Sequence, residues 1–217
     1  MDSSRKQDRN SADTRDPGPQ ESDERQAKSK QRRQPRRITP AYLERAALFY
    51  LERYVTSEAN LRRVLRRKVK RSLEVHGGDQ DEAERWIEEL IVRLRRNGFL
   101  DDAAYAQGLA RSLHRRGKSA RAIEGKLREK GVEAGLIEDA LEDLEAEKPN
   151  SEFRAAVAFA RRRRLGPFRE ESRREERRER DLAALGRQGF SYALARCIVE
   201  AEDVATLEEM LAADPQA

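Results

Sequence analysis

Apolar residues recur every three to four positions over most of this chain, and one such pattern occurs twice. The first copy is Leu127, Gly131, Val132, Leu136, Ile137, Ala140 and Leu141, and the second is Leu185, Gly189, Phe190, Leu194, Ala195, Ile198 and Val199. Each glycine falls where one amphipathic run stops and the next begins, which is typical of a helix that ends in a left-handed residue. Because each copy of such a repeat buries its apolar face against its neighbours, the pattern predicts a modular helical protein.

The helical period predicts three helices in each of three successive modules, over residues 39–99, 100–147 and 148–202, followed by a short C-terminal helix or tail over 203–217. Good N-cap residues mark the expected helix starts. They are Thr39 (before Pro40), Ser57, Asp101 or Asp102, Ser119, Ser151, Ser191 and Asp203. Nowhere do β-branched or aromatic residues alternate with polar ones for long, so the predicted fold class is all-α, with tandem three-helix repeats.

Residues 1–38 form the predicted N-terminal tail. The first 37 contain almost no large apolar side chains, so they cannot offset the entropy lost on ordering, and we expect disorder. Two roles stay open for the basic residues at its end, nucleic-acid contact or simple solubility. These residues are Lys28, Lys30, Arg32, Arg33, Arg36 and Arg37.

Composition narrows the function. The 217 residues are 40% charged, 37% hydrophobic and 6% aromatic, which suits thin helical layers better than one compact core around a deep active site. The net charge is +5, from 46 Lys and Arg against 41 Asp and Glu, and no module is strongly basic overall. A nucleic-acid surface must therefore come from local clusters of cations.

Cellular location is inferred from what the sequence lacks. Cys197 is a single cysteine, so no intramolecular disulfide forms, and its apolar neighbours predict a small buried side chain. No apolar stretch approaches the roughly 18 residues of a membrane span, and the N-terminus shows no hydrophobic signal segment. We expect a cytoplasmic protein without a membrane partner.

The spacing of the histidine, cysteine and glycine residues does not indicate a catalytic site. The two histidines, His76 and His114, do not combine with Cys197 into a zinc or catalytic cluster. The Gly117-Lys118-Ser119 run lacks the upstream glycine of a phosphate-binding loop, because Ser112 stands in its place. We therefore expect no enzyme, metal or cofactor.

The second predicted helix carries cations opposite its apolar stripe, in two four-residue rows: Arg62, Arg66 and Lys70, beside Arg63, Arg67 and Arg71. Glu58 is the only acid between residues 57 and 73. An unbalanced row of this kind favours phosphate binding. A solvated helix face is the alternative.

A second cluster straddles a helix end, a glycine and the start of the next helix, and no acid occurs among residues 103–123. The helix N-terminus adds to its attraction for anions. We expect Arg115, Arg116, Lys118 and Arg121 to contribute most to binding, followed by Arg62, Arg66 and Lys70. Arg111 and His114 complete the cluster.

Two further charged segments are less distinctive. The cations of residues 161–164 suit either anion binding or an ordinary role at a helix C-terminus. Residues 169–180 mix acids and bases evenly, so we expect ion pairs within one helix there.

Two motifs in the middle module carry a family resemblance: residues 97–106 read NGFLDDxxYA, and residues 116–132 read RGKSxxxIxxxLxxKGV. They resemble the RecX family, bacterial regulators of the RecA recombinase, over about residues 40–200. The resemblance implies an elongated, curved array of three-helix repeats and a non-enzymatic protein. Such a protein lodges in the groove of the RecA nucleoprotein filament and limits filament extension, strand exchange, ATP hydrolysis and cleavage of the SOS repressor.

The resemblance thus predicts a role in regulating DNA repair and recombination, with the RecA filament as partner. Contact with single-stranded or filament-bound DNA should be weak and indifferent to sequence, and we expect a monomer. An independent helical DNA-binding or transcription factor is the main alternative, and a helical scaffold without a nucleic-acid role is the third. Which cations contact RecA and which contact DNA stays open.

Overall fold

The computed structural model describes residues 35–212. Most of the predicted disordered tail, residues 1–34, lies outside the described residues, as do residues 213–217. The residues from Arg37 onward belong to one compact unit.

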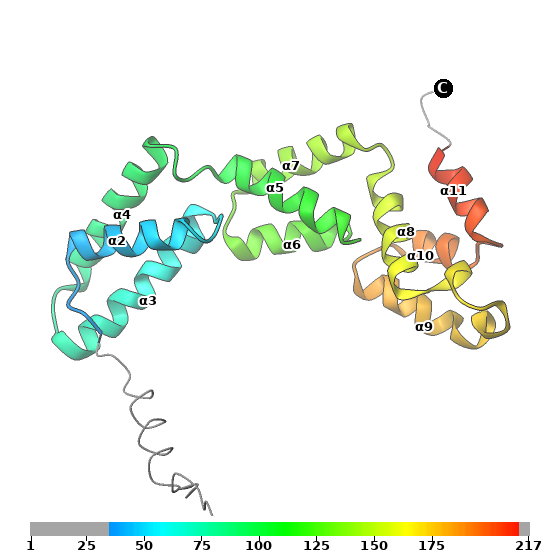
Figure 1. The fold of residues 1–217 in the computed structure, drawn as a ribbon, viewed down its shortest axis with the longest axis horizontal. Helices are drawn as coiled ribbons and strands as arrows, with labels where there is room; N and C mark the ends of the chain where they lie inside the picture. Colours follow the sequence, from blue (N-terminus) through cyan, green and yellow to red (C-terminus); the bar gives the residue numbers. More distant parts are fainter. Residues whose placement is uncertain (1–34, 213–217) are drawn as a thin grey trace, which may run out of the picture. The chain divides into compact units, whose positions relative to one another are not determined.

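Helices account for all regular structure in the described part, and no strand occurs there (Figure 1). This confirms the all-α prediction. None of these helices is long and apolar enough to cross a membrane. The helices are α2 (Pro40–Leu51), α3 (Glu58–His76), α4 (Gln80–Arg96), α5 (Asp102–Arg115), α6 (Ala120–Lys130), α7 (Ala134–Glu147), α8 (Ser151–Arg163), α9 (Arg174–Arg187), α10 (Tyr192–Val199) and α11 (Val204–Ala212), with 3₁₀ turns η1 (Gly166–Phe168) and η2 (Glu171–Arg173).

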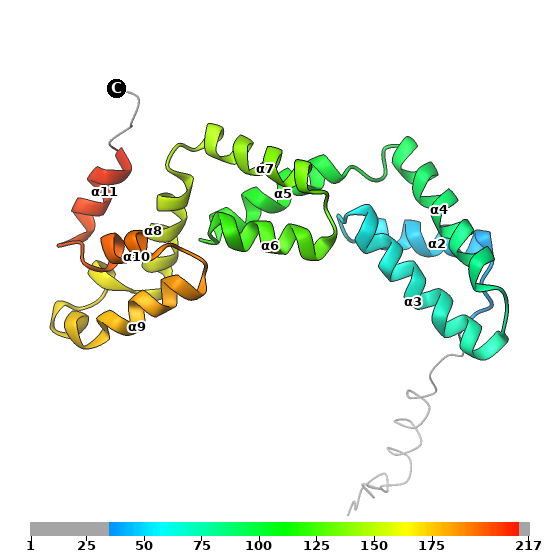
Figure 2. The ribbon, with the colours of Figure 1, turned by 180° about the vertical axis from the view of Figure 1, so that it is seen from behind.

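The buried apolar side chains form three separate clusters, which correspond to three helical modules. One cluster joins α2, α3 and α4, the second joins α5, α6 and α7, and the third joins α8 to α11. Helices α2, α3 and α4 lie side by side from the front and from behind (Figures 1 and 2). Each module therefore buries its own apolar stripes, as expected of tandem three-helix repeats.

The repeated pattern occupies equivalent places in the second and third cores. Leu127 is fully buried where α6 ends, and Leu185 is fully buried near the end of α9. The residues after each glycine, Val132 and Phe190, are buried as well. The apolar spacing in the sequence thus reflects one shared packing arrangement.

Most predicted N-caps are confirmed by their hydrogen bonds, including Asp203, which accepts the N–H of Thr206 at 2.8 Å. The side chains of Ser57, Asp101, Ser119 and Ser191 each accept the backbone N–H three residues ahead, at 2.9 to 3.2 Å. Such a bond satisfies one of the free amides in the first helical turn. The capping residues therefore set the starts of α3, α5, α6 and α10.

The prediction that Ser151 caps a helix is wrong. Asn150 holds the N-cap position of α8 with a φ of +61°, and it forms no side-chain cap. The Glu145 carboxylate instead accepts the backbone N–H groups of Asn150 and Ser151 and the Ser151 hydroxyl. A side chain from the preceding helix satisfies these donors, so the local cap motif was misleading.

The expected ion pairs within residues 169–180 are confirmed only in part. Helix α9 begins at Arg174, after the two 3₁₀ turns. Asp181 is 3% exposed, accepts the Gly166 N–H at 3.0 Å and pairs with Arg169 at 3.0 Å, while Arg178 pairs with Glu200 after α10. Within the stretch, pairs join sequence neighbours only: Arg177 with Glu176, and Arg178 with Glu179. Arg169 and Arg178 therefore connect different elements of the third module.

Cys197 is half-buried rather than buried. Helix α10 directs Ala195, Ile198 and Val199 into the core, which leaves Cys197 at the edge of that face. The apolar neighbours of Cys197 in the sequence did not indicate that its side chain lies at the edge of the buried face.

Candidate nucleic-acid interface

Two serines connect successive modules in the same way. Ser57 caps α3, and its hydroxyl also donates to the backbone carbonyl of Lys130 at 2.5 Å. Ser119 caps α6 and donates to the carbonyl of Gln188 at 2.6 Å. Each hydroxyl accepts a bond in its own module and donates one to the next, so it fixes the start of one helix against the end of another.

The repeated glycines allow this close approach. Gly131 has a φ of +76° and Gly189 a φ of +93°, values that side-chain-bearing residues rarely adopt. A Cβ added at Gly131 would lie 2.5 Å from the Cβ of Ala59, and one at Gly189 would lie 2.5 Å from the Oγ of Ser119. Both glycines are therefore required where a module contacts the one before it.

A carboxylate completes each junction. The N–H of Glu58 donates to Asp102 at 2.8 Å, and the N–H of Ala120 donates to Glu152 at 2.8 Å. Burial raises the pKa of the Asp102 and Glu152 carboxyls above their usual values, although these hydrogen bonds offset part of the effect. The two junctions have the same design, and the second one positions the turn between α5 and α6.

Two of the six cations in the α3 rows, Arg62 and Arg66, are neutralised. Arg62 pairs with Glu58 at 3.2 Å and with Glu88 at 2.9 Å. Arg66 pairs with Glu84 at 2.8 Å and with Glu88 at 3.6 Å. The expectation of an unbalanced row is therefore wrong for Arg62 and Arg66, because most of the compensating acids lie on α4.

The remaining α3 cations divide into two groups. Arg63 donates to the carbonyl of Glu129 at 2.9 Å, so it forms part of the junction between the first two modules. Arg67, Lys70 and Arg71 are exposed and Lys68 is half-buried, and none of these four side chains has a hydrogen bond or ion pair within residues 35–212. Arg67 and Lys70 thus remain candidates for contact with an anionic partner.

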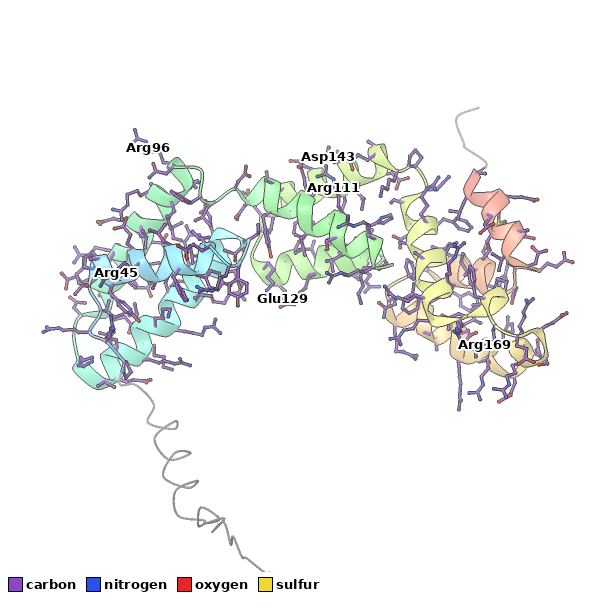
Figure 3. All side chains as sticks on the ribbon, in the orientation of Figure 1. Arg45, Arg96, Arg111, Glu129, Asp143 and Arg169 are labelled. Carbon is purple, nitrogen blue, oxygen red and sulfur yellow. The ribbon has the colours of Figure 1, made fainter. Side chains whose placement is uncertain are left out.

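Arg111 is committed to a partner on α7. Its Nε lies 3.0 Å from an Oε atom of Glu147, and this hydrogen bond holds the pKa of the Glu147 carboxyl below its usual value. Figure 3 labels Arg111 on α5 and Asp143 on the neighbouring α7, and both acids lie on that helix. Arg111 therefore adds little free positive charge to the cluster.

Four cations at the turn from α5 to α6 have no acidic partner among the described residues. Arg115, Arg116 and Arg121 are exposed, and their side chains form no ion pair or hydrogen bond with any described residue. The Nζ of Lys118 donates to the neutral side-chain amide of Gln188 at 2.7 Å. We call these four residues the turn cluster.

His114 belongs to the protein interior rather than to this surface. The ring is 7% exposed, and its Nε2–H donates to the carbonyl of Ser151 at 2.7 Å. Its inclusion among the surface cations was wrong, because α5 directs it toward α8.

Two further cations, Lys148 and Arg154, were not predicted from the sequence; they lie with Arg115 along one cleft. In the sequence, only the position of Lys148 in a break between two predicted helices indicated that its side chain could be exposed at a site.

No group of three or more His, Cys, Asp or Glu side chains in the described part of the chain is placed to hold a metal ion. The candidate site therefore consists of arginine and lysine side chains on a repeated helical framework. Such side chains can bind phosphate or carboxylate groups.

Comparison with known proteins identifies the family. The family model "RecX, second three-helix domain" matches residues 101–141. A protein named regulatory protein RecX from Myxococcus xanthus is 48% identical over 169 residues, which cover 77% of this chain and 89% of that protein. The chain belongs to the RecX family. A RecX protein from Agrobacterium fabrum is 32% identical over 76% of this chain and 88% of its own length.

Solved RecX structures share the fold. The crystal structure of a regulatory protein RecX superposes with a TM-score of 0.52 at 25% identity, over 75% of this chain and 72% of that one. RecX from Lactobacillus salivarius has the same TM-score at 22% identity, over 80% and 96% of the two chains. The RecX family model spans α5, α6 and the first part of α7, so it includes the turn cluster.

Proposed function

We propose that this chain binds the RecA nucleoprotein filament and restrains RecA, lowering its ATPase, strand-exchange and SOS coprotease activities during DNA repair. The role is regulatory rather than enzymatic and needs no cofactor. We place it in the cytoplasm, with the chain acting as a monomer. Membership of the RecX family supports a regulatory role, and the unneutralised turn cluster is the observation that supports a polyanionic partner.

The chemistry of the turn cluster accounts for the expected binding. Arginine and lysine side chains contact phosphates through charge, and the counterions released make the affinity fall as salt rises. Such contacts carry no base information, so any DNA contact is sequence-indifferent. The buried junction with the third module holds Lys118 and Ser119 in place, so the cations are arranged before binding.

A titration of RecA ATPase activity on single-stranded DNA tests the proposal. We expect the purified chain to slow ATP hydrolysis at substoichiometric to stoichiometric amounts relative to RecA. An unchanged rate across that range would reject the proposed function. Tight, sequence-specific DNA binding without RecA would instead support a DNA-binding factor, a role for which the exposed Arg67 and Lys70 on α3 provide the basis.

A further inference from the structure

A cleft of about 580 Å³ lies where the second and third modules meet. Helices α5 and α7 contribute the ends that face α8, and the end of α11 closes one side. The lining residues are His114, Arg115, Glu147, Lys148, Pro149, Arg154, Val157, Ala158, Arg161 and Leu211.

The cleft carries excess positive charge. Arg115 and Lys148 are exposed, and their side chains form no hydrogen bond or ion pair within the described residues, although the charge of Lys148 helps to lower the pKa of Glu147. Arg154 donates only to neutral backbone carbonyls, those of Pro149 and Leu211. The single carboxylate of the lining, Glu147, is already paired with Arg111 outside the cleft. An occupant with carboxylate groups would therefore find free cations.

The walls of the cleft are aliphatic. Pro149, Val157, Ala158 and Leu211 provide the apolar surface, the lining contains no Phe, Tyr or Trp, and the His114 ring is only 7% exposed. Single-stranded nucleic acid is usually held by stacking its bases on aromatic rings. The lining thus favours an aliphatic or aromatic side chain of a peptide over a base.

The chain already shows this mode of recognition on α8. Helix α11 buries Leu207 completely against the third core, and its Glu208 pairs with Arg161 at 2.8 Å. Arg154 holds the end of the same helix through the carbonyl of Leu211 at 3.1 Å. Helix α8 therefore accepts a segment that combines one apolar anchor with an acid, and Arg115 and Lys148 offer the same chemistry further along the cleft.

A polar atom without a partner lies beside the cleft. The Nε2–H of His114 donates to the carbonyl of Ser151, and the buried Nδ1 of the same ring has no hydrogen-bond partner in the described residues. Buried polar atoms usually have partners. A peptide occupant would bring polar backbone groups as well as side chains to this part of the chain.

We propose that the cleft binds a peptide segment of a protein partner, in which carboxylates flank one large apolar side chain. The apolar side chain packs on Val157 and Ala158. The flanking carboxylates bind Arg115 and Lys148. This inference goes beyond filament binding, because it assigns a second, peptide-binding site to the face of α8 and holds whether or not the peptide comes from RecA.

Selection from a random peptide library displayed on phage tests the proposal with the full chain as bait. We expect enriched sequences to place Asp or Glu beside Leu, Ile, Phe or Met. Synthetic copies of these peptides should bind the wild-type chain and lose about tenfold in affinity to Lys148→Glu. Ala158→Trp fills the cleft from an exposed position and should abolish binding.

Arg45→Glu provides the matched control. Arg45 is exposed on α2, has no partner among residues 35–212 and lies in the first module (Figure 3). Arg45→Glu changes the net charge by the same amount as Lys148→Glu but lies outside the cleft. Peptide affinity should therefore stay at the wild-type value. Circular dichroism should show equal helicity in all variants.

Three results would overturn the proposal: no enrichment, enriched peptides without acids, or peptide binding that survives both cleft variants. Displacement of the peptide by a single-stranded oligonucleotide, with the oligonucleotide itself losing affinity to Ala158→Trp, would assign the cleft to nucleic acid instead. Neither cleft variant alters the turn residues Arg116, Lys118 and Arg121. A failure here therefore leaves the RecA ATPase test unaffected.

Discussion

The arginine row of α3 and the turn cluster between α5 and α6 look alike in the sequence but differ in the folded chain. Both are rich in cations and almost free of local acids. Acids on α4 neutralise Arg62 and Arg66, whereas Arg115, Arg116 and Arg121 have no acidic partner in the described structure. The difference shows that charge balance depends on the neighbouring helix as well as on the local sequence.

The largest expected effect comes from reversing charge in the turn cluster. Arg116→Glu combined with Arg121→Glu should weaken binding to the RecA filament about tenfold or more, because two unpaired cations become repulsive anions. Fluorescence anisotropy of the labelled chain against filaments on single-stranded DNA measures this. Neither side chain makes a contact in the structure, so helicity should stay constant. Unchanged affinity would remove the cluster from the interface.

Truncating the α3 row should reduce stability instead of binding. Arg62→Ala removes the ion pair at 3.2 Å from the Glu58 carboxylate, whose side chain is only 12% exposed, and leaves it with Arg95 at 3.5 Å. Loss of such a partly buried pair costs about 1–3 kcal/mol of unfolding free energy. Urea unfolding measures the loss, and Arg116→Ala, at an unpaired exposed position, should change stability by less than about 0.5 kcal/mol. Equal losses of unfolding free energy for Arg62→Ala and Arg116→Ala would contradict the contrast between the α3 row and the turn cluster.

Removing the acids of α4 should leave the α3 row with unpaired cations, as in the turn cluster. Glu84→Gln with Glu88→Gln leaves Arg66 without either of its carboxylates and Arg62 with Glu58 alone. We expect the affinity for single-stranded DNA to rise about threefold and its salt dependence to steepen, because more cations are available to phosphate. Binding titrations at several salt concentrations check this. A parallel Glu138→Gln/Glu142→Gln variant controls for net charge, because these two acids of α7 form no ion pair with any residue between 35 and 212.

The smallest effect concerns the junction that supports the turn cluster. The raised pKa of Glu152 means that the folded chain binds a proton more tightly than the unfolded chain. This group's contribution to stability is therefore greatest at acid pH and falls as pH rises through the raised pKa. Relative to Glu152→Gln, the wild type should lose unfolding free energy as the pH rises above the usual carboxyl pKa and through the raised one. A pH-independent difference in urea unfolding would contradict this assignment.

Sequence patterns predicted the framework well because its determinants are local. Ser57, Asp101, Ser119 and Ser191 cap helices through bonds that span three residues, and the glycine of each repeat adopts the positive φ expected of it. Where a cap depended on another helix, as at Ser151, the prediction was wrong.

The candidate site was harder to predict because its determinants are distant in sequence. Glu88 lies 26 residues from Arg62, and Gln188 lies 70 residues from Lys118. The inward orientation of His114 depends on the carbonyl of Ser151, 37 residues away. No local count of charges contains this information. The expected module boundaries and the roles of the ten proposed binding residues stay predictions.

Hydrogen–deuterium exchange of the wild-type chain, with and without RecA filaments on single-stranded DNA, tests the central claim most directly. The account predicts slower amide exchange at the end of α5, in the following turn and in the first turn of α6 when filaments are present. We also expect little change around the neutralised Arg62 and Arg66 on α3. Protection of α3 without protection at the turn between α5 and α6 would contradict the account.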